Sequence, residues 1–285
     1  MKKIYIVAAI LLIIAAAAVI FQFAGTDSEF SRYNTEWNGT SNFFSGLSHE
    51  QYIYDYADLT EKTNSTLLVI APTENFGGDE LFTYLTNGNT IIIFDQSANA
   101  NYFLESIGST IRVHNESLRS SDMEYKDSGL FRANVLTDIY GTGVETLFFN
   151  YPGYVTGGYT IIETSPLSWV EKRGDNIANK DETLKVYSVG ASDNISNGRV
   201  TVIADPSMFI NSMIDRRHTE NMEVITALEN QNLIIDQTNS VTTEGGGLFG
   251  LLNLMNRFPA VSAVILALLF ISAGLVCIRR YYKNE

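Results

Sequence analysis

Hydrophobic residues in this chain gather into two long uncharged runs near its ends and several short runs between them. Ile4 to Ala24 and Phe258 to Ile278 each hold 21 residues without a charged side chain. A helix of that length rises about 31 Å, which matches the hydrocarbon core of a bilayer. The pattern therefore predicts one transmembrane helix near each end of the chain.

The charges that flank these runs predict an orientation. Lys2 and Lys3 precede the first run, and Arg279, Arg280 and Lys283 follow the second. Positive charge beside a spanning helix favours the cytoplasmic side. We therefore expect a two-pass protein of the cell membrane, with both termini cytoplasmic and the central region extracytoplasmic. A cleaved signal peptide remains the alternative for the first run, although no clear small-residue cleavage site follows it.

Short apolar runs in the central region have the character of buried strands. Thr66 to Ala71, Thr90 to Phe94 and Arg199 to Ala204 are rich in β-branched residues, and turn-forming residues end each of them. Strands that are apolar on both faces are typical of parallel sheets. Helical stripes follow each run, as at Leu81 to Leu85 and Met222 to Leu228. This alternation predicts an α/β domain with a doubly wound, mostly parallel sheet of the amidotransferase or flavodoxin type.

The same pattern divides the chain into segments. We expect an N-terminal anchor over 1–25, a polar stalk over 26–45 and the α/β domain over 46–235. A Gly-rich linker with an interfacial helix follows over 236–257, and 258–285 holds the second anchor and a basic tail. Three further strands are predicted within the domain, over Leu147–Tyr151, Tyr159–Glu163 and Leu184–Val189, and a polar loop is predicted over Asp175–Glu182.

Charge and cysteine content exclude several classes of function. The whole chain carries a net charge of −13. The region between the two runs holds 14 basic and 31 acidic residues, a balance of −17. Binding to nucleic acid or to anionic lipid needs basic patches, so neither is expected there. The only cysteine is Cys277, inside the second long run. The central region therefore has no disulfide and no thiolate nucleophile.

Polar side chains cluster where the predicted strands end. Parallel sheets bind ligands at the carboxyl ends of their strands. Asp, Ser, Thr and Asn also stand at these positions as helix caps, and the sequence leaves that alternative open. The candidate binding residues are Thr73, Glu74, Asp95, Gln96, Ser97, Asp205, Ser207 and Asn211.

The central region contains none of the common catalytic motifs. The central region has no Gly-x-Ser-x-Gly elbow, and its histidines, His49, His114 and His218, are not paired as metal ligands. Asp95 and Asp205 at strand ends can together hold a hard cation, but such pairs are common in this fold class. We therefore predict no catalytic residue, no bound metal and no cofactor.

Two stretches carry a resemblance to a known family. They are TLLVIAPTENFGGDELFTYLTNGNTIIIFDQSANANYFLESIG at Thr66–Gly108 and RVTVIADPSMFINSMI at Arg199–Ile214. They resemble the family "domain of unknown function 4350" over roughly 45–235. The resemblance implies a fold similar to class I glutamine amidotransferases and a role beside MoxR-type AAA ATPases and von Willebrand A-like proteins. Amidotransferase chemistry does not carry over, because the central region lacks the cysteine that performs it.

Three roles follow as hypotheses. The first is a non-catalytic binding or scaffold module within a membrane-associated assembly. The second is a hydrolase of envelope material that uses Glu74, Asp95 and Asp205 as acid and base. The third is an accessory subunit of a transporter or of a MoxR-type ATPase system.

Overall fold

Strands β2 (Thr66–Ile70) and β3 (Thr90–Phe94) pair in parallel at the centre of a 12-stranded sheet. The computed structural model describes residues 26–244, apart from 48–50, 140 and 217. The main path across the sheet runs β1-β14-β2-β3-β13-β12-β10-β7-β6, with β8 beside β7 and β9 between β12 and β4. A separate two-stranded sheet pairs β5 with β11.

The other elements are short. The remaining strands are β1 (Gln51–Ile53), β4 (Arg112–His114), β5 (Leu118–Ser120), β6 (Met123–Glu124), β7 (Asp127–Val135), β8 (Thr146–Asn150), β9 (Tyr154–Thr156), β10 (Tyr159–Glu163), β11 (Ser168–Val170), β12 (Ser188–Ile195), β13 (Gly198–Ile203) and β14 (Leu233–Asp236). The α-helices are α2 (Ser41–Gly46), α3 (Asp79–Thr86), α4 (Asn101–Ser106), α5 (Asn211–Arg216) and α6 (Thr219–Glu229). Three 3-10 turns are η1 (Tyr56–Leu59), η2 (Pro206–Phe209) and η3 (Val241–Thr243).

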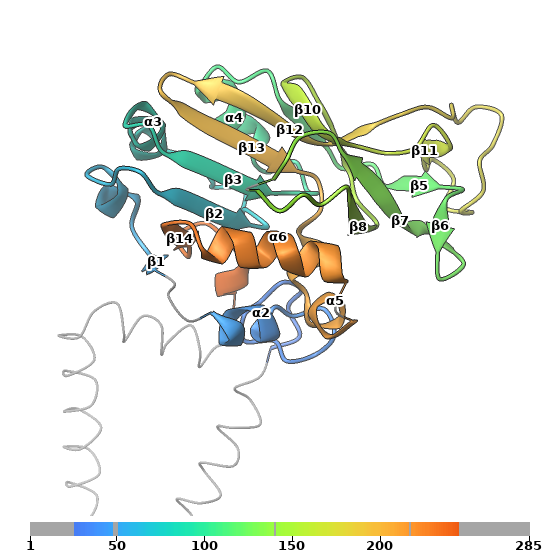
Figure 1. Ribbon diagram of the computed structural model, residues 1–285, viewed down its shortest axis with the longest axis horizontal. Coiled ribbons are helices and arrows are strands. Elements are labelled where there is room, and N and C mark those ends of the chain that lie inside the picture. The colour runs from blue at the N-terminus through green and yellow to red at the C-terminus, as the bar shows by residue number, and fades with distance from the viewer. Residues whose placement is uncertain (1–25, 48–50, 140, 217, 245–285) are drawn as a thin grey trace, which may run out of the picture. The chain divides into compact units, whose positions relative to one another are not determined.

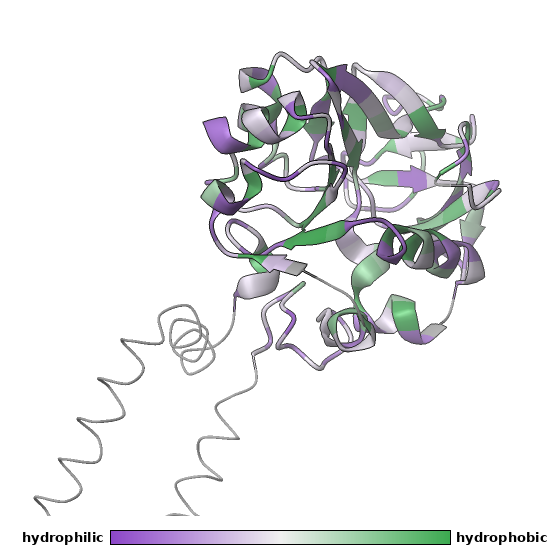
Figure 2. Cartoon of the chain, turned by 60° about the vertical axis from the view of Figure 1, so that its left-hand side comes forward, coloured by the Kyte–Doolittle hydropathy of each residue, from purple (hydrophilic) through white to green (hydrophobic). Residues whose placement is uncertain are grey.

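The central strands bury side chains on both faces, as their continuous apolar sequences predict. Successive side chains of a strand point to opposite faces. Leu67 and Val69 pack in the cluster that contains residues of α3 and α4, whereas Leu68 and Ile70 pack in the cluster that contains residues of α6. Helices therefore cover both faces of the parallel region (Figure 1). Figure 2 colours the described residues by hydropathy and shows green hydrophobic stretches on strands and helices, with purple hydrophilic residues on many of the loops.

The predicted fold class is wrong. Four strand pairings in the described residues are parallel, those of β1-β14, β14-β2, β2-β3 and β3-β13, whereas seven pairings of the same sheet are antiparallel. The sheet is mixed and strand-rich, with few helices, and not a mostly parallel doubly wound sheet. The antiparallel half includes strands such as β7, in which buried residues alternate with half-buried or exposed ones along much of the strand. Such strands lack the continuous apolar run on which the prediction depended.

The two-pass membrane topology is also corrected. Over the described part of the chain, no helix combines the length and the apolar character needed to cross a bilayer. The runs predicted as spans, 4–24 and 258–278, lie outside the described residues.

Residues 26–45, predicted as a stalk, pack onto the rest of the described chain. Phe43 and Phe44 of α2 are buried, and Phe43 packs edge-to-face on Phe209 with ring centroids 4.8 Å apart. The backbone N–H of Arg32 donates to the carbonyl of Thr242 over 3.0 Å. The two ends of the described chain therefore meet.

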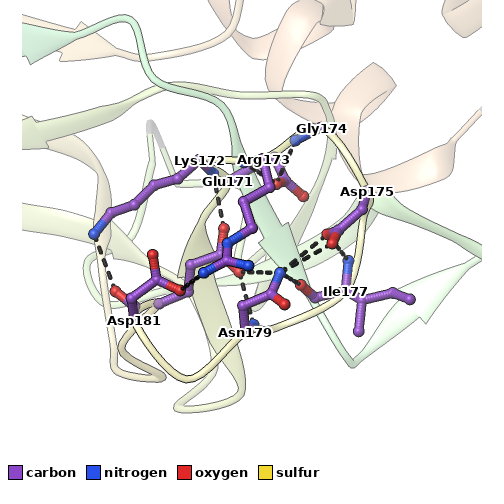
Figure 3. Close-up of polar contacts among 9 residues, drawn as sticks. Glu171, Lys172, Arg173, Gly174, Asp175, Ile177, Asn179 and Asp181 are labelled. Atoms are coloured by element: carbon purple, nitrogen blue, oxygen red, sulfur yellow. Dashed lines mark hydrogen bonds and ion pairs between the residues drawn. The ribbon is translucent and has the colours of Figure 1, made fainter.

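The predicted polar loop over Asp175–Glu182 is a loop in the structure, and its carboxylates organise it. Asp181 forms an ion pair of 2.7 Å with Arg173, and Asn179 donates to both oxygens of Asp175 over 3.1 Å (Figure 3). Glu171 accepts backbone hydrogen bonds of 2.8 Å from Arg173 and Gly174 (Figure 3). The acidic residues here stabilise the backbone of their own loop.

Candidate functional site

Asp95 and Asp205 end neighbouring parallel strands, so their backbones lie side by side. The N–H of Asp95 donates to the carbonyl of Ile203 over 3.0 Å, which continues the pairing of β3 with β13. The carboxyl-edge prediction thus brings these two residues to the same edge of the sheet. Their side chains, however, are buried, with 0% and 1% of their surface exposed.

The carboxylate of Asp95 caps the turn that leads into α4. One oxygen accepts the backbone N–H of Ser97 over 2.7 Å, and the other accepts that of Ala100 over 2.8 Å. Burial raises the pKa of Asp95, and the backbone hydrogen bonds oppose that rise. Both oxygens are engaged by their own loop, as the capping alternative predicts.

Asp205 joins two segments that are distant in sequence. Its carboxylate accepts the backbone N–H of Ser207, in the first turn of η2, and the backbone N–H of Asn150 at the end of β8, each over 2.7 Å. Burial raises the pKa of Asp205 to about 6. Its role is to anchor β8 to the end of β13.

Asp236 is a third strand-end carboxylate, and the sequence analysis missed it. It ends β14, is fully buried, and accepts the backbone N–H of Thr238 over 2.8 Å and the hydroxyl of Tyr56 over 3.0 Å. Burial raises its pKa to about 6. A repeated signal marked it: Asp-Gln-Ser at 95–97, Asp-Pro-Ser at 205–207 and Asp-Gln-Thr at 236–238 share one spacing. In each, the carboxylate accepts the N–H two residues later.

Asn211 holds the N-terminal segment and does not face the other candidates. Its amide nitrogen donates to the carbonyls of Asn34 and Glu36 over 3.2 and 2.6 Å and to the hydroxyl of Ser41 over 3.0 Å. Its amide oxygen accepts the backbone N–H of Asn42 over 2.8 Å. Every polar atom of this side chain is therefore used within the fold.

The remaining candidates are dispersed. Ser207 is buried, with its hydroxyl 3.5 Å from the carbonyl of Asn150, whereas Glu74 and Ser97 are exposed. Thr73 and Gln96 are half-buried. The Oε1 atom of Gln96 is enclosed and has no hydrogen-bond partner among the described residues. Apart from Asn211, the candidates lie just beyond the ends of β2, β3 and β13, without forming a common site.

A cavity of about 580 Å³ lies instead on the face of the sheet beside α6. We call it the sheet-face cavity. Four neighbouring strands, helix α6 and the loop that follows β7 line it. Its lining includes Thr90, Ile92, Phe94, Thr137, Asp138, Ile139, Gly141, Tyr159, Ile161, Ser192, Asp193, Asn194, Arg199, Thr201, Ile203, Val224 and Leu228. A volume of this size accommodates a small organic molecule.

The register of the strands arranges this lining in rows. Thr90, Arg199 and Asn194 pair in one row, and Phe94 pairs with Ile203 in another. Because residues two apart in a strand share a face, alternate residues of β3, β13 and β10 meet in the cavity. Sequence reasoning missed it because no local motif marks a surface assembled from residues 90 to 228.

Among the described residues, no group of three or more His, Cys, Asp or Glu side chains comes close enough together to hold a metal ion.

Comparison with known proteins gives a family match and a likeness to solved structures. Residues 32–228 match the family described as "Domain of unknown function (DUF4350)". No curated protein matches the chain. Among solved structures, the "mmIFT52 N-terminal domain" is similar with a TM-score of 0.46 and 16% identity, over 66% of this chain and 85% of that chain.

Proposed function

We propose that this chain, which belongs to the DUF4350 family, is a non-catalytic binding module whose ligand occupies the sheet-face cavity. The observation that carries the proposal is a contrast between two surfaces. The carboxylates at the strand ends are buried and accept hydrogen bonds from their own backbone. The cavity on the sheet face combines an apolar floor with hydroxyl and charged groups, which is the usual composition of a small-molecule site.

The hydrolase hypothesis is less well supported. A glycosidase acid and base must both reach the scissile bond. Asp95 and Asp205 are almost fully buried, and backbone N–H groups occupy both oxygens of each. Glu74 is exposed, but it lacks an accessible carboxylate partner among the other two residues of the hypothesis.

The scaffold role in a membrane-associated assembly and the identity of the protein partners are predictions. They require that a MoxR-type ATPase or a von Willebrand A-like protein binds to this chain. Co-purification of either class with the full-length chain would support this aspect of the proposal.

A ligand screen with cavity-filling variants tests the binding proposal. The full-length protein is screened by thermal shift and ligand-observed NMR against a library of small organic compounds. Thr201→Trp and Thr90→Trp place an indole in the cavity from two different strands. Thr183→Trp is the matched control, because Thr183 is exposed and does not line the cavity.

We expect compounds that bind the wild type and the control but lose binding in both cavity-filling variants. If no compound shows this pattern, the proposal is wrong. Turnover of a model ester or glycoside that disappears in Asp95→Asn or Asp205→Asn would replace it with the hydrolase hypothesis. Circular dichroism establishes that each variant is folded, and either filling variant is sufficient if the other fails to fold.

A further inference from the structure

The sheet-face cavity changes from polar to apolar along the strands that form its floor. At one end lie Thr90, Arg199 and Asn194, which pair across β3, β13 and β12. At the other end lie Phe94 and Ile203, which pair two rows further along. Since Thr90 and Phe94 are four residues apart, the two ends are separated by roughly 13 Å at about 3.3 Å per residue.

The middle row completes the gradient. Thr201 pairs with Ser192 on one side and with Ile92 on the other. The hydroxyls of Ser192 and Thr201 lie 3.1 Å apart and contact each other. The row thus presents hydroxyls that are already hydrogen-bonded beside an aliphatic side chain, which is intermediate in polarity between the two ends.

The apolar end has walls as well as a floor. Val224 and Leu228 of α6 are almost fully buried there, with 1% and 2% of their surface exposed. Ile161 of β10 lines the same cavity, at a shift in the register of β10 against β12. Phe94 and Ile203 expose only 0% and 4% of their surface, so the carbon open to a ligand at this end includes that of Ile161, which is half-buried. Burying an alkyl chain against it is favourable.

Arg199 is the one basic side chain of the cavity lining, which also holds the acidic side chains of Asp138 and Asp193. Its side chain is exposed and forms neither a hydrogen bond nor an ion pair with any described residue. The two acidic residues of the lining are engaged elsewhere. Asp193 accepts hydrogen bonds from Ser109 and Thr110, and Asp138 accepts the backbone N–H of Gly143.

We propose that the sheet-face cavity binds an elongated amphipathic carboxylate, with its carboxylate on Arg199 and its saturated chain directed toward Phe94 and Ile203. This inference rests on the proposed function, because it names the ligand class of the same cavity. A guanidinium pairs with a carboxylate through two parallel hydrogen bonds, which makes Arg199 suited to this head group. A chain of about ten carbons matches the roughly 13 Å between the two ends.

Decanoate is the probe, used below its micelle-forming concentration with the full-length protein. Decanol and decyltrimethylammonium share its chain and carry a neutral and a positive head group. Binding is measured by calorimetry to the wild type, Arg199→Gln, Thr201→Trp and Thr90→Trp. Arg173→Gln is the matched control, because it removes the same charge from an exposed loop outside the cavity.

We expect decanoate to bind the wild type and Arg173→Gln equally. Arg199→Gln should weaken it about two- to fivefold, as for an exposed ion pair. Both filling variants should abolish binding. Shortening the chain from decanoate to octanoate to hexanoate should weaken binding about two- to fourfold for each methylene removed.

The outcomes separate the two proposals. If decanol binds as tightly as decanoate, Arg199→Gln has no effect and the filling variants abolish binding, the carboxylate inference is wrong and the binding proposal stands. If the filling variants still bind decanoate, the ligand lies elsewhere and the carboxylate inference is wrong. If none of the three probes binds, the inference is also wrong, and the library screen decides the binding proposal separately.

Discussion

Tyr56 donates its hydroxyl hydrogen to Oδ2 of Asp236 over 3.0 Å, and both side chains are buried. Tyr56 lies in η1 and Asp236 at the end of β14, so this contact joins segments 180 residues apart in sequence. Burial raises the pKa of both groups, and the hydrogen bond partly offsets the rise for Asp236. The pair fixes η1 against the edge of the parallel strands.

Replacing Tyr56 with Phe tests the energetic role of this pair. The variant leaves the shape of the core intact but removes the donor from a buried carboxylate. We expect a loss of about 1–3 kcal/mol in the free energy of unfolding at pH 7.5 and a smaller loss near pH 5, where Asp236 is protonated. Urea titration at both pH values measures this. An equal loss at the two pH values would show that the hydroxyl does not interact with the charged form of Asp236.

The stability of the described domain should increase as the solution becomes mildly acidic. Asp205 and Asp236 each have a pKa raised from 3.8 to about 6 in the folded state. The folded state therefore binds protons more tightly than the unfolded state between these values. The contribution of these two aspartates to the free energy of unfolding is fully present near pH 4 and is lost as the pH rises through about 6. For each aspartate, the upper limit of this contribution is about 3 kcal/mol.

Urea unfolding between pH 7.5 and pH 4.5 checks this direction. Asp236→Asn, which stays neutral throughout, should flatten the dependence in part, because Asp95 and Asp205 keep their raised pKa values. A domain that loses stability steadily from pH 7.5 to pH 5 would contradict the assignment of raised pKa values to these buried carboxylates.

Asn211→Ala should release the N-terminal segment. The substitution leaves the carbonyls of Asn34 and Glu36 and the N–H of Asn42 without their partner. We expect a loss of about 2–4 kcal/mol, the range for breaking a buried hydrogen-bond network. Hydrogen exchange should quicken first at Asn42 and Ser212, whose amide bonds lie at this contact.

Asn197→Ala is the control for that experiment. Its exposed amide donates one hydrogen bond of 3.0 Å to the carbonyl of Thr86, so the loss should stay below about 1 kcal/mol. Equal losses in the two variants would mean that Asn211 does not hold the segment.

Ala98→Gly should stabilise the domain. Ala98 follows the cap formed by Asp95 and has a φ of 66°, a left-handed conformation that favours glycine. Relief of this conformation should outweigh the added flexibility of the unfolded chain by about 0.5–1 kcal/mol. Thermal unfolding measures the gain. Ala100→Gly is the control, since Ala100 has a φ of −72° and should lose stability on the same change.

The sequence predicted the parts of the structure whose residues are buried on both sides. Thr66–Ile70, Thr90–Phe94 and Gly198–Ile203 are strands at nearly the predicted positions, because a continuous β-branched run has few other stable environments. Predictions were poorer for β7 and β12. Their sequences, DSGLFRANV and SVGASDNI, mix polar and small residues, and their strand character depends on neighbours far along the chain.

The site predictions were also accurate where local sequence decides the feature and poor where distant segments decide it. Asp95 and Asp205 were correctly placed at strand ends, but local sequence does not distinguish a side chain that caps a turn from one that faces a ligand. That distinction depends on burial, which distant segments such as Asn150 provide. The sheet-face cavity depends on the register of four strands, so a residue such as Arg199 acquires its significance only after the strands have paired.

The hydrogen bond between Arg32 and Thr242 brings the first and last segments of the described chain together. A pull that separated these two segments would load this contact at once, before any strand pairing of the central sheet carried the force. Tension on the two ends of the described domain would therefore act first on this hydrogen bond and only afterwards on the strands of the central sheet.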